Sequence, residues 1–95
     1  MLADVVEDVL RVLGAHEQNV DWTARWATSE EMTAELRDHL ARLRREDFSR
    51  LAQLKSLFLP TGPLQEVSLS SGWGAEYLTL ATRFDRAVRA AEKTA

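Results

Sequence analysis

The segment 28-TSEEMTAELRDHLARLRREDFSRLAQLKSLF-58 carries the pattern that decides the fold. Acidic side chains gather at its beginning and basic ones further along, an arrangement that stabilises a helix dipole. Thr28, with Glu31 three positions later, predicts a capping box at the start. Apolar side chains then recur every three or four positions, apart from one step of five, as along one face of an α-helix: Met32, Leu36, Leu40, Leu43, Phe48, Leu51, Leu54 and Phe58.

This pattern predicts one continuous helix of about 30 residues. The apolar spacing shifts by one residue at Glu46 and Asp47, which leaves open a bend or a break there, with Asp47 capping a second piece. A continuous helix of this size spans about 45 Å, whereas a globule of this chain length is roughly 26 Å across. The mismatch predicts either a bend in the helix or an end that projects toward a partner.

The flanking segments also have helical periodicity, and no segment alternates with a period of two. The sequence therefore predicts an all-α fold: a small bundle of four to five helices with one long central helix and a helix-turn-helix-like C-terminal pair. We treat 1–95 as a single domain in which the last residues, from about Lys93, are disordered. The other helices are expected at about 2–13, 20–27 (with Asn19 as N-cap), 63–71 and 74–92.

Composition narrows the classes of function. The chain has no cysteine, which excludes disulfides and thiolate zinc sites. Its 12 Lys and Arg against 15 Asp and Glu give a net charge of -3, which weighs against non-specific nucleic-acid binding. Neither a signal peptide nor an apolar run of the roughly 18–20 residues that span a bilayer is recognisable. We expect a cytoplasmic protein without membrane contact.

Residues for catalysis or metal binding are sparse. Glu35 and His39 are four positions apart and share a helix face, but a catalytic metal site needs about three converging ligands. The clustered Ser68, Ser70 and Ser71 lack the strand and glycine context of a nucleophile elbow. We expect no enzymatic activity, no cofactor and no metal. A metal-binding or enzymatic bundle that uses Glu35 and His39 is the weakest of three hypotheses.

The segment 64-LQEVSLSSGWGAEYLTLATRFDR-86 resembles a helix-turn-helix, in which the second helix enters the DNA major groove. Gly72 lies in the turn, and Leu78 is expected to pack on the first helix. Residues 63–92 are thus an alternative DNA-binding element. However, four bases and three acids give residues 74–93 a net charge of only +1, which disfavours this alternative. The exposed contact residues are expected to be Thr79, Thr82, Arg83 and Arg86.

The leading hypothesis is a non-enzymatic helical protein-interaction or regulatory module that self-associates as a homodimer. Trp73 follows a glycine that suits a left-handed helix cap, so we expect it to pack on the preceding helix, with a role as a partner anchor as the alternative. Trp22 and Trp26 lie one turn apart and either close the bundle or form an exposed pair. Candidate interaction residues are Trp22, Trp26, Arg44, Arg45 and Trp73.

Overall fold

A computed structural model describes residues 2–20, 23, 25–59 and 62–94. Within these residues the chain forms five helices and no strand, so the predicted all-α class is confirmed. None of these helices is long and apolar enough to cross a membrane. The helices are α1 (Leu2–Ala15), α2 (Ser29–Arg44), α3 (Leu51–Leu57), α4 (Pro63–Ser71) and α5 (Gly74–Thr94).

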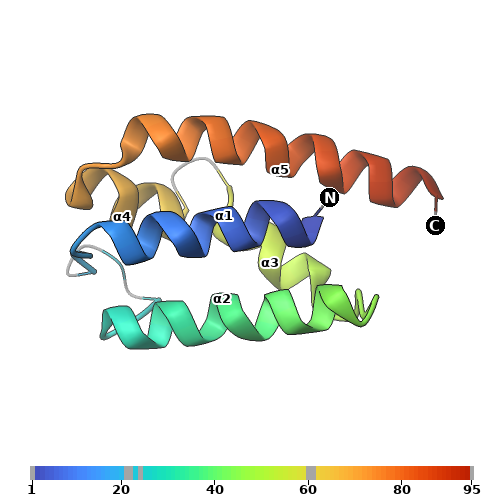
Figure 1. Cartoon of the computed structure of the whole chain (residues 1–95), viewed down its shortest axis with the longest axis horizontal. Helices are drawn as coiled ribbons and strands as arrows, with labels where there is room; N and C mark the ends of the chain where they lie inside the picture. Colours follow the sequence, from blue (N-terminus) through green and yellow to red (C-terminus); the bar gives the residue numbers. More distant parts are fainter. Residues whose placement is uncertain (1, 21–22, 24, 60–61, 95) are drawn as a thin grey trace.

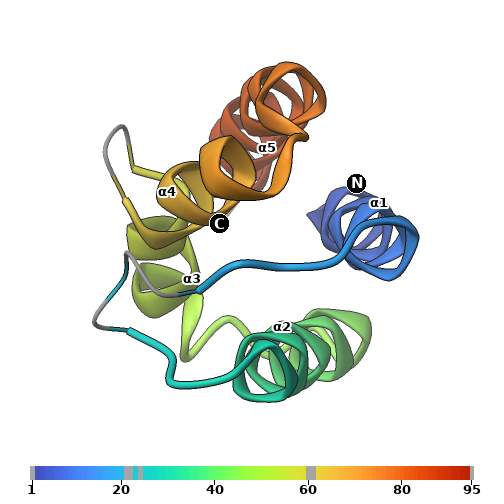
Figure 2. The same ribbon diagram turned by 90° about the vertical axis from the view of Figure 1, so that its left-hand side faces the viewer.

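Helix α1 lies between α2 and α5 and runs antiparallel to both (Figure 1). The end-on view in Figure 2 shows α3 and α4 closing the side of the bundle away from α1. Side chains from all five helices meet in the core, among them Val6, Met32, Leu54, Leu64 and Phe84. The molecule extends 37 Å along its longest axis and 22 Å along the other two.

The single long helix predicted for residues 29–58 is wrong, because the chain breaks after Arg44. Glu46 adopts a left-handed conformation with a φ of 57°. The amide of Asp47 donates to the carbonyl of Arg42 at 2.8 Å, which closes the end of α2 as a Schellman cap. Helix α3 starts afresh at Leu51, with Arg50 rather than Asp47 as its N-cap residue. The break removes the length mismatch that suggested a projecting helix end.

The short helix predicted for residues 20–27 is also wrong for the residues that the structure describes there, which form coil and bends. Asn19 does not cap a helix; its amide donates to the Ser71 hydroxyl at 2.8 Å. Thr28 begins α2 as predicted, accepting from the Glu31 amide at 3.2 Å. At the other end of the chain, α5 continues through Lys93 to Thr94.

Candidate functional site

A groove of about 450 Å³ runs along α5, between it and the segment formed by α3 and α4. We call it the α5 groove. Phe58 contributes to its floor and stacks on Phe84, with ring centroids 3.9 Å apart. The lining combines apolar and charged side chains: Lys55, Phe58, Leu59, Gln65, Tyr77, Leu78, Ala81, Phe84, Asp85, Val88, Arg89 and Glu92.

Two leucines that line the α5 groove are largely exposed. Leu78 is 63% exposed and Leu59 is 56% exposed. The buried face of α5 is formed instead by Tyr77, Leu80 and Phe84. The expectation that Leu78 packs on the preceding helix is therefore wrong, because the neighbouring Tyr77 turns inward and meets Trp73 edge-on at 6.1 Å.

A third exposed leucine extends the apolar surface beyond the groove. Leu69, in α4, is 67% exposed, and its side chain reaches within 3.0 Å of where a Cβ would stand at Gly74. Gly74 lies one helical turn before Leu78, so both positions share a face of α5. We call Leu59, Leu69 and Leu78 the groove leucines; they are three of the four large apolar side chains exposed among the described residues.

The Tyr77 side chain brings a polar atom to this apolar surface. Tyr77 is 2% exposed, and its hydroxyl has no hydrogen-bond partner among the described residues. Burial, with a smaller contribution from the Asp85 carboxylate, raises the pKa of Tyr77 to about 12. The hydroxyl therefore stays protonated at neutral pH and has a hydrogen to donate.

The charges along the groove are balanced. Lys55 and Arg89 contribute two cations, and Asp85 and Glu92 contribute two anions. Lys55 in α3 pairs with Glu92 in α5, Nζ to Oε2, at 3.3 Å. The groove thus offers apolar contact with no net charge.

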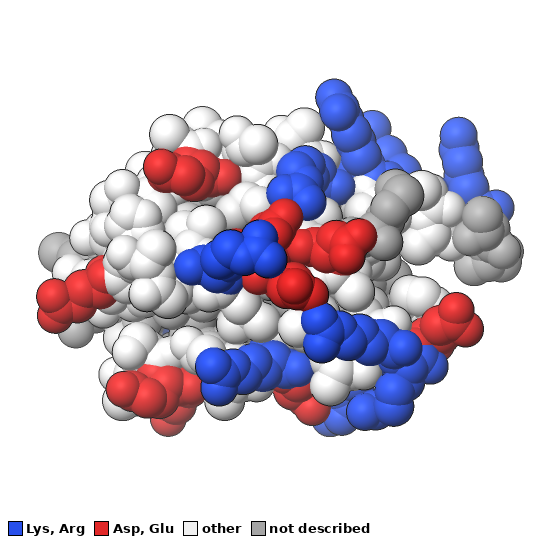
Figure 3. Space-filling model, in the orientation of Figure 1, with Lys and Arg blue, Asp and Glu red and all other residues white. Residues whose placement is uncertain are grey.

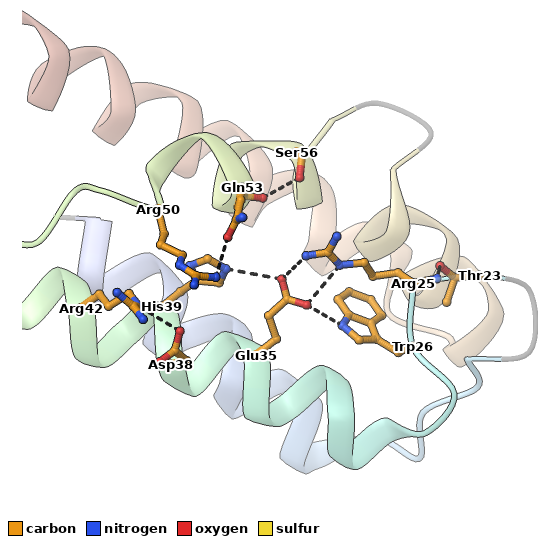
Figure 4. Close-up of polar contacts among 10 residues, drawn as sticks. All are labelled: Thr23, Arg25, Trp26, Glu35, Asp38, His39, Arg42, Arg50, Gln53 and Ser56. Atoms are coloured by element: carbon orange, nitrogen blue, oxygen red, sulfur yellow. Dashed lines mark hydrogen bonds and ion pairs between the residues drawn. The ribbon is translucent and has the colours of Figure 1, made fainter.

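A second polar cluster surrounds Glu35 on the other side of the core (Figure 4). The Arg25 guanidinium donates to both carboxylate oxygens, at 3.1 and 2.5 Å, and the Trp26 indole donates to Oε1 at 2.9 Å. His39, one turn further along α2, places its Nε2 3.4 Å from Oε2. The predicted proximity of Glu35 and His39 is confirmed.

The geometry of this cluster suits a structural role. Partial burial raises the pKa of Glu35, but the hydrogen bonds from Arg25 and Trp26 and the Arg25 charge lower it more, so the pKa lies below its ordinary value. The carboxylate is thus ionised and saturated with donors. Across the described ranges, no three His, Asp or Glu side chains are grouped to hold a metal ion. The cluster ties the connection before α2 to the body of the helix.

The two described tryptophans from the predicted interaction set are buried. Trp26 is 4% exposed and Trp73 is 0% exposed, so neither ring forms the exposed surface considered for it. Trp73 takes the predicted cap position: Gly72 has a φ of 85°, and the Trp73 amide donates to the Ser68 carbonyl at 2.9 Å. Its indole donates to Gln18 at 2.8 Å. Trp22 lies outside the described residues.

The two arginines of that set are exposed but paired within the chain. Arg44 contacts Glu7 of α1, Nη2 to Oε2, at 2.5 Å. Arg45 lies 3.9 Å from Asp47. Such exposed pairs contribute little to stability, and they offer no concentrated charge to a partner.

The residues proposed for DNA contact lie on the exposed face of α5, as expected: Thr79, Thr82, Arg83 and Arg86. However, Arg83 pairs with Asp8 of α1, Nη1 to Oδ2, at 2.7 Å. The hydrogen bond from Arg83 lowers the pKa of Asp8. Figure 3 shows acidic and basic side chains interleaved over α1, beside this helix.

Reasoning from sequence missed the groove leucines and the Tyr77 hydroxyl as site features. A signal existed for Leu69, because the inward positions 64, 67 and 68 place residue 69 on the opposite face of its helix. No comparable signal existed for Leu59, whose surroundings depend on how α3 and α5 pack together. Comparison with known protein families, curated proteins and solved structures finds no match for this chain.

Proposed function

We propose that this chain is a non-enzymatic helical interaction module that self-associates through the α5 groove. The observation that carries the proposal is that two exposed leucines, Leu59 and Leu78, line one groove, and a third, Leu69, extends the apolar surface beside it. Exposed apolar side chains gathered on one surface are typical of protein-protein contacts, whereas scattered ones are not. The proposal moves the contact surface from the tryptophans to the groove leucines.

The chemistry of the groove favours a second copy as its occupant. A two-fold interface uses the same surface on both subunits, so that surface must fit itself. Here the projecting leucines and the groove that receives them lie on the same face of the molecule. Lys55 and Glu92 pair within the chain, which leaves Arg89 and Asp85 as opposite charges that can meet their counterparts in the other copy. A strongly charged partner gains nothing from such a balanced surface.

An interface of standard size would cover a small share of the surface of this chain. A stable interface buries about 800 Å² on each partner, roughly one seventh of the 5778 Å² accessible surface of this chain. The groove and the leucines span α3, α4 and α5. Contact through two or three helices supplies an area of this size more readily than a single exposed side chain.

Sedimentation velocity over a range of concentrations tests the proposal. We expect a dimer that dissociates on dilution, and we expect Leu78→Gln to weaken it about tenfold or more, since removing an apolar anchor from an interface removes over ~1.4 kcal/mol. Glutamine keeps the length of the side chain and its helix propensity. The matched control is Phe48→Gln, since Phe48 is 49% exposed but lies outside the groove.

The outcomes separate cleanly. A wild-type chain that stays monomeric at millimolar concentration contradicts self-association. A dimer disrupted by Phe48→Gln but not by Leu78→Gln contradicts the choice of surface. A dimer lost only in Leu78→Gln supports both parts of the proposal.

The alternative function is DNA binding through α4 and α5. What supports it is the tight Gly72 turn between the two helices. What weighs against it is that Arg83 is already paired with Asp8. Fluorescence anisotropy with duplex DNA tests it: a specific binder loses affinity as salt rises and when Arg83 and Arg86 are changed to alanine. Unchanged affinity in these variants removes the alternative.

A further inference from the structure

The Tyr77 hydroxyl has no evident use in the free chain. Its ring packs edge-on to Trp73 and 6.2 Å from Phe58, contacts that a phenylalanine makes equally well. A buried hydroxyl without a partner destabilises a folded protein, and such groups are rare in native structures. The sequence therefore carries an oxygen atom here that folding alone does not favour.

The position of the hydroxyl connects it with the groove. Tyr77 belongs to the groove lining, together with the exposed Leu78 and the buried Phe84. The Asp85 carboxylate, two turns along α5, is near enough for its charge to act on this hydroxyl. A donor without an acceptor thus belongs to a residue that lines the groove.

We infer that Tyr77 determines the specificity of the α5 groove by donating a hydrogen bond to an acceptor that the second copy brings into it. This inference rests on the self-association proposed above. The second copy carries a suitable acceptor in the same groove, the carboxylate of Asp85. The oxygen is shielded in the free chain, so the groove lining must move when the second copy docks.

A hydrogen bond formed only in the complex has a specific signature. Replacing Tyr77 with phenylalanine removes the unmet donor from the monomer and the bond from the dimer. The monomer should therefore gain stability while the dimer loses affinity. A residue that only packs in the core does not produce these opposite changes, because an altered core weakens the folded chain and the dimer together.

The experiment compares the wild-type chain with Tyr77→Phe. We expect the melting temperature in dilute, monomeric solution to rise by a few degrees. We expect dimerisation, measured by sedimentation velocity, to weaken about fivefold. Leu78→Gln is the control, since it should weaken the dimer without raising the melting temperature of the monomer.

Each result bears on one idea. Opposite changes in Tyr77→Phe support the hydrogen bond to the second copy. A wild-type dimer that Tyr77→Phe leaves unchanged or tightens overturns the role of Tyr77 but leaves self-association in place. A wild-type chain that never dimerises overturns the proposed function, and the role of Tyr77 with it.

Discussion

At the scale of the residue, Glu35 shows how a carboxylate is used to hold a connection in place. Its oxygens accept from Arg25 and Trp26, both in the segment before α2, while Glu35 itself lies in the second turn of that helix. The Trp26 ring is buried only because its N–H finds this acceptor, since a buried indole without a partner is unfavourable. The Glu35 side chain therefore holds in place both the connection before α2 and the Trp26 ring.

We predict that Glu35→Gln lowers the free energy of unfolding by about 1–2 kcal/mol at neutral pH, because a neutral amide makes weaker bonds to Arg25 and the group is partly exposed. Urea denaturation measures the difference. Glu17→Gln, at an exposed position outside the helices, is the control and should change stability little. Equal stability of Glu35→Gln and the wild-type chain contradicts a structural role for the cluster.

The same carboxylate predicts a pH dependence. The pKa of Glu35 is lower in the folded chain than its ordinary value of 4.5. Its contribution to stability is therefore present above that value and is lost as the pH falls through the folded-state pKa. We expect the wild-type chain to lose more stability than Glu35→Gln between about pH 5 and pH 3. Parallel losses in the two proteins contradict this assignment.

The two buried tryptophans show which features of a residue can be predicted from the sequence and which cannot. The core position of Trp73 is predictable because Gly72, the residue before it, signals a left-handed cap. The acceptor of its indole is not predictable, since Gln18 lies 55 positions away and meets it only in the folded chain. Trp26 is similar: its spacing from Trp22 suggests a shared helix face, but Glu35 and Arg25 decide its surroundings.

At the scale of the element, two helices end in the left-handed conformation with different residues. Helix α4 ends at Gly72, with a φ of 85°, and α2 is followed by Glu46, with a φ of 57°. Glycine adopts this conformation without strain, whereas a residue with a Cβ is destabilised in it. The negative charge of Glu46 also lies at the unfavourable end of the helix dipole.

We predict opposite effects of substitution at these two caps. Glu46→Gly should raise the free energy of unfolding by about 1 kcal/mol, because it relieves the left-handed strain. Gly72→Ala should lower it by about 1–2 kcal/mol, although an added Cβ meets no atom within 4 Å there. Thermal and urea unfolding measure both variants. Effects of the same sign in the two variants contradict this account of the caps.

The break at Glu46 explains why the helix lengths could not all be predicted. The apolar stripe continues across it from Leu43 to Leu51, and no glycine or proline marks an end. A sequence shows glycine, proline and the period of an apolar stripe. It does not show the tertiary contacts that decide whether a helix bends or breaks. Where proline and glycine do occur, at Pro63 and Gly72, the predicted bounds of α4 match the structure.

At the scale of the whole molecule, the expectation of association now has a different basis. A helix too long for the globule is absent, since the longest described helix, α5, has 21 residues and the longest axis is 37 Å. What favours association is the surface of the α5 groove and its leucines. The fold class could be predicted from the helical period of the sequence alone. The groove surface could not, because it depends on which side chains remain exposed when α3, α4 and α5 pack together.

Self-association predicts that thermal stability depends on concentration. Binding between folded copies shifts unfolding by mass action, so the melting temperature should rise by about 5 °C or more over a hundredfold increase in concentration. Leu78→Gln should have a melting temperature that stays constant over the same range. Differential scanning fluorimetry with intrinsic tryptophan emission measures both. A constant melting temperature in the wild-type chain contradicts the dimer.

The place of α1 between α2 and α5 also has a consequence for how the chain is made. Of the five helices, α1 leaves the ribosome first and α5 last, yet they share one core. Because synthesis adds about 5–20 residues per second, α5 follows α1 only after several seconds. During this interval the apolar surface that α1 presents to α5 has no cover from that helix. Nascent chains stalled before residue 74 should therefore engage chaperones, and completed chains should not.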